Sequence, residues 1–217
     1  MMRKVFTILG IGTLAMFGTR QLQAQTNLRF GLKGGLNLSH AHSEIDDQSA
    51  LDADREYNGF GPGFHAGALA ELSFPKGSKF KLQLEGLYNL NFMTLKEASN
   101  NDIQNKFTLH SVQVPLSVRY FIVPDFSFNA GLSANFNVAA YQKMDNGDYK
   151  NIKDDVNITP MQLGLHAGAT YYIHKGFFVE ARYNYFLGDV MTSKHTNLYD
   201  LDYNTGTLQL GLGYKFE

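Results

Sequence analysis

The stretch DFSFNAGLSANFNVAAY, residues 125–141, is apolar at every second position. Phe126, Phe128, Leu132 and Phe136 fall on one face of an extended chain, and serines, asparagines and a glycine fall on the other. Side chains of a strand alternate between two faces in this way, and a helical period does not fit the spacing. The stretch therefore predicts a β-strand with one apolar face and one small, polar face.

The same alternation recurs in seven further segments. They are residues 29–39, 63–74, 79–92, 111–122, 161–173, 177–187 and 207–216. The composition agrees with β structure, since the 217 residues include 17 Phe, 12 Tyr and 21 Gly. Cysteine is absent, which excludes disulfides and thiolate metal sites.

The connections between these segments alternate between short and long. The short ones are residues 75–78, 123–125 and 174–176, and the long ones are 40–61, 95–105, 142–159 and 188–204. Outer-membrane barrels have short periplasmic turns and long external loops. We therefore expect an all-β fold, an eight-stranded antiparallel up-and-down transmembrane β-barrel with both termini on the periplasmic side.

Aromatic residues support this orientation. Each strand carries one at its expected periplasmic end, as an interfacial girdle requires: Phe30, Phe74, Phe80, Tyr120, Phe126, Tyr171, Phe177, and Tyr214 with Phe216. The opposite ends are more mixed, with Phe64, Phe92, Phe107 and Tyr185. A soluble barrel would place its apolar face inside, and a secreted lipocalin-like carrier or sandwich is the alternative fold.

The N-terminus resembles a secretory signal. Arg3 and Lys4 precede the uncharged run Val5–Gly18, which at 14 residues is too short for a spanning helix, and Ala24 supplies a small residue for cleavage. We expect residues 1–24 to be removed and residues 25–217 to form the barrel domain. An amphipathic first helix is the alternative. The formal net charge of -1 gives no sign of a nucleic-acid partner.

The segments GLKGGLNLS, VQVPLSVRYF, FNAGLSANF, LGLHAGATYY, VEARYNYFLGDV and LQLGLGYKF together resemble the PorT-like outer-membrane β-barrel family of Bacteroidetes, over about residues 28–216. The resemblance implies an eight-stranded barrel in the outer membrane of a Gram-negative bacterium. It also implies a link to protein secretion through the namesake of the family, although most members have no assigned activity. Barrels of this type usually end on an aromatic residue, whereas in this chain Phe216 is penultimate and Glu217 is last.

Charged residues on the polar faces are expected to point into a narrow lumen that side chains fill. They are Arg29, Lys33, Glu71, Lys81, Glu85, Arg119, Glu180, Arg182 and Lys215. Because buried charges must be paired, we interpret them as a structural network, in which Lys33 requires Glu71, Glu85 or Glu180 as its partner. Gly31 and Gly35 are expected to leave room for longer side chains. A proton- or ion-conducting path is the alternative interpretation.

Two residues in the segment 111–122 or next to it are unusual, Pro115 and His110. Pro115 cannot donate to a ladder and a closed barrel has no edge, so we expect a bulge that bends the strand there. His110 falls on the lipid-facing parity. Either the register shifts near residue 111, or His110 lies above the bilayer.

The long connections carry polar residues with two possible roles. Acidic residues gather in them: Glu44, Asp46, Asp47, Asp52, Asp54 and Glu56 in the first, and Asp145, Asp148, Asp154 and Asp155 in the third. Neither run has calcium-loop spacing, so solvated loops are expected, and binding of divalent ions is the alternative. Asp189, Ser193 and His195, or His110 and Ser111, could serve a lipid-modifying enzyme, but no nucleophile motif surrounds either serine.

The sequence thus predicts a non-enzymatic outer-membrane protein with no catalytic residue, cofactor or metal. It would act as a structural, adhesion or assembly component through its external loops. The expected partners are outer-membrane lipid and lipopolysaccharide, the barrel-assembly machinery during insertion, and a protein at the external loops or the periplasmic side. A barrel-embedded enzyme acting on lipid A or phospholipid, and a secreted lipocalin-like carrier, are the alternative functions.

Overall fold

The computed structural model describes residues 27–45, 55–75, 77–97, 104–143, 149–151, 157–187, 191–192 and 201–216, and side chains for most of them. Its eight long strands are β1 (Asn27–Ile45), β2 (Arg55–Ser73), β3 (Phe80–Glu97), β4 (Gln104–Val123), β5 (Phe126–Lys143), β8 (Met161–His174), β9 (Phe177–Leu187) and β11 (Leu201–Lys215). Of three further short strands, β6 (Tyr149–Asn151) pairs with the end of β5, and β7 (Asn157–Ile158) and β10 (Met191–Thr192) form a separate two-stranded sheet.

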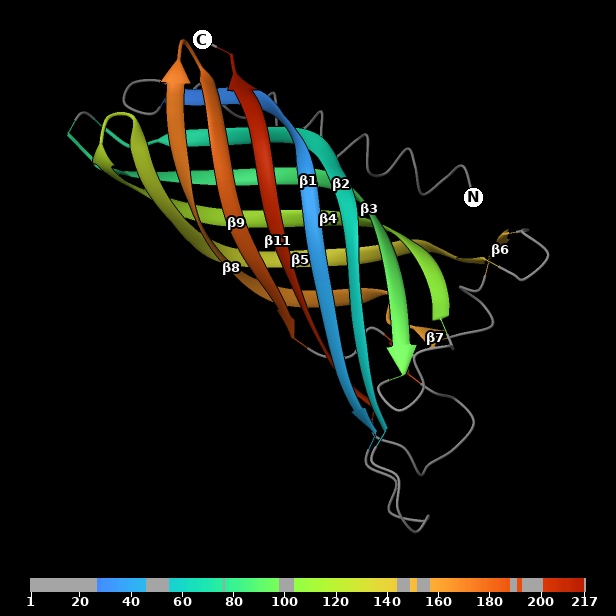
Figure 1. Cartoon of the computed structure of the whole chain (residues 1–217). Helices are drawn as coiled ribbons and strands as arrows, with labels where there is room; N and C mark the ends of the chain where they lie inside the picture. The colour runs from blue at the N-terminus through green and yellow to red at the C-terminus, as the bar shows by residue number, and fades with distance from the viewer. Residues whose placement is uncertain are drawn as a thin grey trace, which may run out of the picture.

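The eight long strands form a closed antiparallel barrel (Figure 1). Each pairs with its neighbours in chain order, and closure comes from the pairing of β1 with β11, which runs from Gly31 opposite Lys215 to Ile45 opposite Leu201. The tight turn between β8 and β9 uses positive φ angles at Lys175 and Gly176, as hairpin turns between twisted strands require. The predicted fold class is confirmed. None of the residues that the structure describes forms a helix long and apolar enough to cross a membrane.

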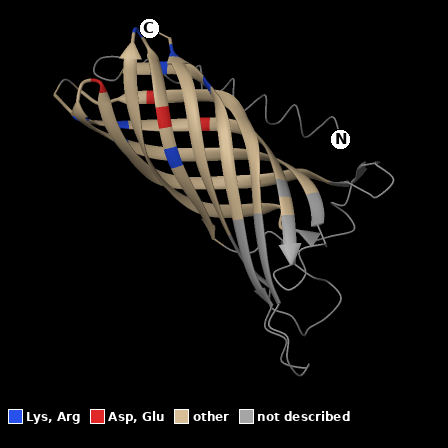
Figure 2. Ribbon diagram, in the orientation of Figure 1, with Lys and Arg blue, Asp and Glu red and all other residues tan. Residues whose placement is uncertain are grey.

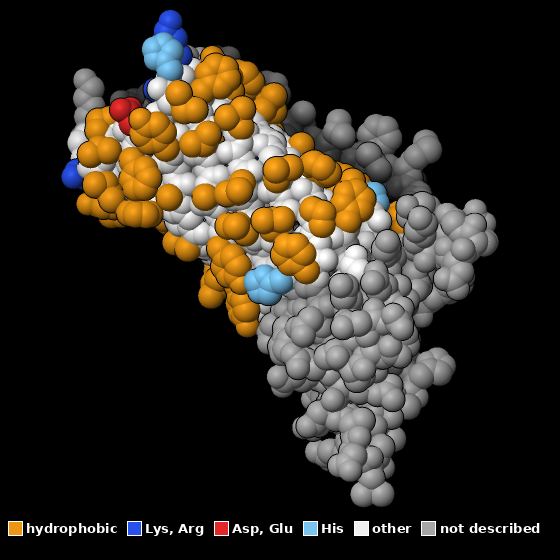
Figure 3. Space-filling model, viewed as in Figure 1, with side chains coloured by type: hydrophobic (Ala, Val, Ile, Leu, Met, Phe, Trp, Pro, Cys, Tyr) orange, Lys and Arg blue, Asp and Glu red, His pale blue; other side chains and the backbone are white. Residues whose placement is uncertain are grey.

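The two faces of the wall differ as the alternation predicts. Apolar side chains point outward, with Leu132 62% exposed, whereas Arg119 on the inner face is fully buried. Figure 3 shows one side of this outer surface, where hydrophobic side chains cover the described part of the barrel. This distribution is the reverse of that in a soluble lipocalin-like barrel. It is the arrangement that a lipid environment requires.

The girdle at the end with the short turns contains the expected aromatic residues. Phe80 packs on Tyr120 with ring centroids 5.0 Å apart, and Phe177 packs on Tyr214 at 4.7 Å. At the other end the prediction for Phe107 was wrong. Phe107 packs with Leu109 against the buried Ala140, because it has the inward parity of β4.

The strands are longer than the alternation predicts. The first long connection was expected at residues 40–61, but β1 continues to Ile45 and β2 begins at Arg55. β3 and β4 likewise stay paired as far as Lys96 opposite Gln104. Beyond the apolar band both faces of a strand are polar, so the period-2 signal disappears while the backbone ladder continues.

The interruption at Pro115 is not a bulge, so that prediction was wrong. The pairing of β3 with β4 skips Glu85 and Gly86, opposite Pro115 and Val114, and resumes in the same register. On its other side Pro115 pairs in register with Ser133. The missing N–H of Pro115 is thus accommodated by a local gap in one ladder.

A register shift does occur near residue 111, as one of the two interpretations of His110 predicts. His110 pairs with Ala139 but Ser111 pairs with Asn137, which leaves Val138 of β5 as the extra residue. The shift reverses the parity of β5. Asn137 and Ala140 are therefore both buried, although they are three positions apart, an odd number.

Gly35 is required by a close approach of two strands. A Cβ at this position would lie 2.0 Å from the carbonyl oxygen of Leu210 and 2.8 Å from the ring of His65. The glycine was expected to leave room for side chains. It does leave room for the ring of His65, but the closer contact that it avoids is with the backbone of β11.

A polar lumen as the candidate functional site

The lumen contains two layers of polar side chains, which we define by their residues. The charged layer consists of Lys33, Glu71, Lys81, Glu85, Arg119, Glu180, Arg182 and Lys215 with Gln83, Thr170 and Tyr172. The amide layer consists of Asn37, His65, Asn89, Gln113, Asn184 and Gln209. Figure 2 shows that the charged residues on the described strands lie toward the end that holds the C-terminus, which is the end predicted to face the periplasm.

Glu180 of β9 is the centre of the charged layer. Lys33 Nζ donates to its Oε1 at 2.7 Å, and Arg119 donates through Nη2 to Oε2. Arg182 Nη2 lies 2.9 Å from Oε1, and Thr170 donates to Oε2 at 3.0 Å. The Glu180 carboxylate therefore joins residues from β1, β4, β8 and its own strand. Buried charges of this kind are tolerated because each is paired and hydrogen-bonded.

Glu85 of β3 is a second shared carboxylate. Arg182 donates to its Oε1, as does Gln83 at 2.7 Å. Lys33 Nζ lies 2.8 Å from Oε2, outside hydrogen-bond geometry, so this contact is an ion pair only. Lys33 is thus held between Glu85 and Glu180, two of the three carboxylates predicted for it.

Glu71 of β2 forms a separate group nearer the periplasmic rim. It accepts hydrogen bonds from Lys215 and, at 3.1 Å, from Lys81. Tyr172 connects this group to the centre, because its hydroxyl accepts from Lys215 at 2.6 Å and from Arg119 Nη1 at 3.0 Å.

The predicted lumen residues therefore meet, with two differences at the rim. Lys81 retains 23% exposure of its side chain. Arg29 has the inward parity and lies opposite Glu71 in the register, but it is exposed. β1 begins at Asn27, only two residues earlier, so Arg29 lies at the mouth of the barrel and not inside it.

Sequence reasoning missed Tyr172 and the fully buried Phe178. Tyr172 shares the parity of Thr170, and Phe178 shares that of Glu180. Parity alone could therefore have placed both residues in the lumen.

The amide layer lies further from the C-terminal end than the charged layer and consists of neutral groups. His65 Nδ1 lies 2.7 Å from Asn37 Oδ1, and the Asn37 amide donates to Asn89 at 3.2 Å. Gln209 donates to Asn89 at 3.1 Å and to Gln113 at 3.2 Å. Asn184 completes the chain: its amide donates to Gln209 at 3.0 Å, and its Oδ1 accepts from Gln113 at 2.9 Å. This series of hydrogen-bonded side chains crosses the barrel from wall to wall.

The described part of the lumen has an excess of positive charge. Five cations, Lys33, Lys81, Arg119, Arg182 and Lys215, face three carboxylates, Glu71, Glu85 and Glu180. Among the described residues, Arg182 Nε and Nη1 and Arg119 Nε have no hydrogen-bond partner. Any small ion that enters this part of the barrel would meet a positive potential.

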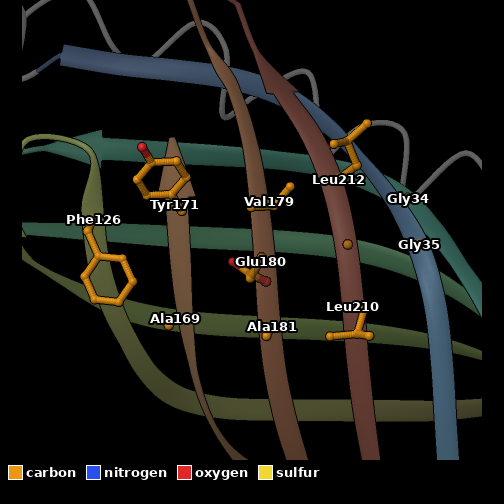
Figure 4. A pocket seen from close by; sticks show the side chains of 11 residues that line it. Gly34, Gly35, Phe126, Ala169, Tyr171, Val179, Glu180, Ala181, Leu210 and Leu212 are labelled. Atoms are coloured by element: carbon orange, nitrogen blue, oxygen red, sulfur yellow. The ribbon is translucent and has the colours of Figure 1, made fainter. Parts of the chain in front are cut away.

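A hollow of about 550 Å³ lies on the outer surface, not in the lumen (Figure 4). Small residues, including Gly34, Ala169 and Ala181, form its floor between Tyr171 and Leu212. The one charged residue beside it, Glu180, is buried with its carboxylate in the charged layer. The hollow is an apolar depression in the lipid-facing surface and offers no group for chemistry.

The residues considered for enzymatic or metal chemistry form no site in the described part of the chain. His110 and Ser111 point to opposite faces of β4, since Ser111 is buried in the lumen and His110 bonds the outward Tyr88. Asp189, Ser193 and His195 lie outside the described residues. So do Asp46, Asp47, Asp52, Asp54, Asp145, Asp148, Asp154 and Asp155, and of Glu44 and Glu56 only the backbone is described. Within the described residues no group of His, Asp or Glu could hold a metal ion.

Comparisons with known proteins give one family match and several similar solved structures. The family model for the outer membrane protein beta-barrel domain matches residues 23–192. Similar solved structures include neisserial surface protein A, with 17% identity, 86% of this chain and 97% of that chain covered, and a TM-score of 0.47. Another is OprG from Pseudomonas aeruginosa, with 14% identity, 90% of this chain and 99% of that chain covered, and a TM-score of 0.46. The attachment invasion locus protein Ail of Yersinia pestis is also similar, with 18% identity, 85% of this chain and 99% of that chain covered, and a TM-score of 0.41. No curated protein matches the chain.

Proposed function

Because the chain belongs to the family of the outer membrane protein beta-barrel domain, we propose that it is a non-enzymatic outer-membrane component that does not conduct solutes. It acts through its external loops, as a structural, adhesion or assembly and secretion component of the Gram-negative outer membrane. The resemblance to the PorT-like barrels of Bacteroidetes makes a secretion-associated role one of these candidates. On this proposal the mature domain is residues 25–217, after cleavage of the signal.

One observation carries the proposal. Glu180 alone joins side chains from four strands, and at another depth the amide layer crosses the barrel from wall to wall. An eight-stranded barrel has an interior just wide enough to be filled by side chains. A filled lumen leaves the parts of the molecule outside the membrane as its working surface.

Conductance in a planar lipid bilayer tests the closed lumen. The full chain should give no steady conductance steps. A variant with Arg119→Ala and Arg182→Ala, which removes the two largest fully buried lumen side chains, should give small steps. Heat-modifiable migration on gels confirms that both proteins are folded. Steady steps from the unaltered chain, equal to those of the variant, would contradict the proposal.

Mass spectrometry of lipid A and phospholipids separates the enzyme alternative. Membranes with and without the protein should show the same acyl and headgroup pattern. A changed acyl pattern that depends on Ser193 or His195 would replace the proposal with a barrel-embedded lipid-modifying enzyme.

A further inference from the structure

Two histidines on the outer, lipid-facing surface are each hydrogen-bonded to a tyrosine. The Tyr88 hydroxyl lies 2.6 Å from Nδ1 of His110, and the Tyr183 hydroxyl lies 3.3 Å from Nε2 of His40. Tyr88 and Tyr183 are 49% and 42% exposed, so neither pair belongs to the lumen. Tyr141 adds a second ring to the first pair, edge-on to His110 at 5.4 Å.

Local features of the fold build both pairs. The extra residue Val138 reverses the parity of β5, and Tyr141 consequently lies outward beside His110 while Ala140 turns inward. Bulges commonly re-aim side chains in this way. In the second pair, a Cβ on Gly206 would lie 2.2 Å from the Tyr183 hydroxyl and 2.3 Å from the His40 ring. Only glycine lets the two rings close over β11.

Both histidines lie at the same depth. His40 is ten residues beyond the girdle residue Phe30 on β1, and His110 is ten residues beyond the girdle residue Tyr120 on β4. Ten residues of strand extend ~34 Å, which at a tilt of about 40° is ~26 Å along the barrel axis. An apolar band of ~25 Å therefore ends at His40 and His110, at the level of the external headgroups.

We propose that the two His–Tyr pairs bind phosphate groups of lipid A in the outer leaflet. With the tyrosine hydroxyl taken as the donor in each pair, the ring proton stays on the other nitrogen, which is Nε2 in His110 and Nδ1 in His40. Among the described residues, none bonds that second nitrogen in either histidine. At this depth the abundant acceptor is a lipid phosphate, and hydrogen bonds to charged acceptors are the strong ones.

Native mass spectrometry of the full chain refolded in maltoside detergent tests the proposal. The protein is mixed with lipid A carrying both phosphates, with the same lipid A after dephosphorylation, or with phosphatidylglycerol, and retained lipid is counted. The unaltered chain should retain phosphorylated lipid A about tenfold more strongly than the dephosphorylated form, as expected for a hydrogen bond to a charged acceptor. The variant with His40→Phe and His110→Phe should lose this preference.

Two variants sharpen the test. His174→Phe removes an exposed histidine at the periplasmic end and should leave the preference unchanged. Tyr88→Phe keeps His110 but removes the hydroxyl that orients it, so part of the preference should be lost. Phenylalanine is itself a girdle residue, and heat-modifiable migration verifies that each variant is folded.

Three results would overturn the proposal: an unchanged preference in the double variant, equal retention of the two lipid A forms, or retention of phosphatidylglycerol equal to that of phosphorylated lipid A. If the double variant fails to fold, the ¹⁵N chemical shifts of His40 and His110 in the unaltered chain decide. They should differ between phosphorylated and dephosphorylated lipid A, and identical shifts would refute the site. The site does not depend on the loop function proposed above, since a conducting barrel could carry it equally well.

Discussion

The charged layer and the amide layer of the lumen fill the same barrel in different ways. In the charged layer a few carboxylates are each shared among several cations, as Glu180 is among Lys33, Arg119 and Arg182. In the amide layer each amide side chain makes several neutral hydrogen bonds, as Gln113 does with Asn89, Ser133, Asn184 and Gln209. Loss of one shared carboxylate leaves several buried cations with less compensating charge, whereas loss of one amide leaves only neutral, weaker hydrogen bonds unmade. The two layers should therefore differ strongly in their tolerance of substitution.

The largest effect is expected from Glu180→Gln. The change keeps the shape of the side chain but leaves Lys33, Arg119 and Arg182 with less compensating charge in a buried site. Breaking a buried ion pair in this way costs about 3–5 kcal/mol. Because the chain has no Trp, the free energy of unfolding in lipid vesicles is best followed by circular dichroism or gel mobility. A loss below about 1 kcal/mol would show that Glu180 is not the centre of the network.

Lys33→Met tests whether Lys33 and Glu180 are coupled. Alone it should destabilise the barrel, because Glu85 and Glu180 lose a shared cation. Combined with Glu180→Gln it should cost less than the sum of the two single changes, with a coupling of about 1–3 kcal/mol. The double-mutant cycle of unfolding free energies measures this value, and strict additivity would contradict the shared network.

A smaller effect is expected in the amide layer from Gln113→Leu. Gln113 donates to Asn184 at 2.9 Å and accepts from Gln209 at 3.2 Å. Leucine is of similar size, so the cost is that of unmade neutral hydrogen bonds, about 1–2 kcal/mol. The same unfolding measurement applies. A cost as large as that of Glu180→Gln would erase the distinction between the layers.

The smallest effect is expected from Pro115→Ala, at the border of the two layers. Alanine restores an N–H opposite the skipped residues Glu85 and Gly86, which can add a bond worth ~1 kcal/mol. It also removes the restriction that proline places on the unfolded chain, which costs a similar amount. The net change in unfolding free energy should be close to zero. A loss above about 2 kcal/mol would mean that the gap in the ladder is itself required.

Much of the barrel and lumen could be predicted from sequence because lipid imposes a strict alternation. Lys33, Glu85 and Glu180 each lie on the polar parity of an apolar strand, and that parity places them inside any closed barrel. The alternation of short and long connections then orients the strands. Both signals are local, so a single sequence contains them.

Three features could not be predicted, for a common physical reason. The continuation of β1 to Ile45, the place of the extra residue at Val138 of β5 and the contact of Tyr88 with His110 all depend on pairing between neighbouring strands. Pairing is set by backbone register across strands, which side-chain parity within one strand does not record. The prediction of a bulge at Pro115 was wrong for the same reason. The sequence shows that Pro115 lacks an N–H, but it does not show how the neighbouring strand adapts to that.

The lumen network also bears on the order in which the barrel is assembled. Its bonds join distant parts of the chain: Lys33 and Glu180 are 147 residues apart, and Ser39 and Thr207 are 168 apart. Lys215, on the last strand, reaches Glu71 on the second. The network can therefore be completed only after β11 pairs with β1. A slip of one residue at that seam would turn Lys215 of β11 toward lipid, so its ion pair with Glu71 favours the correct register at the moment of closure.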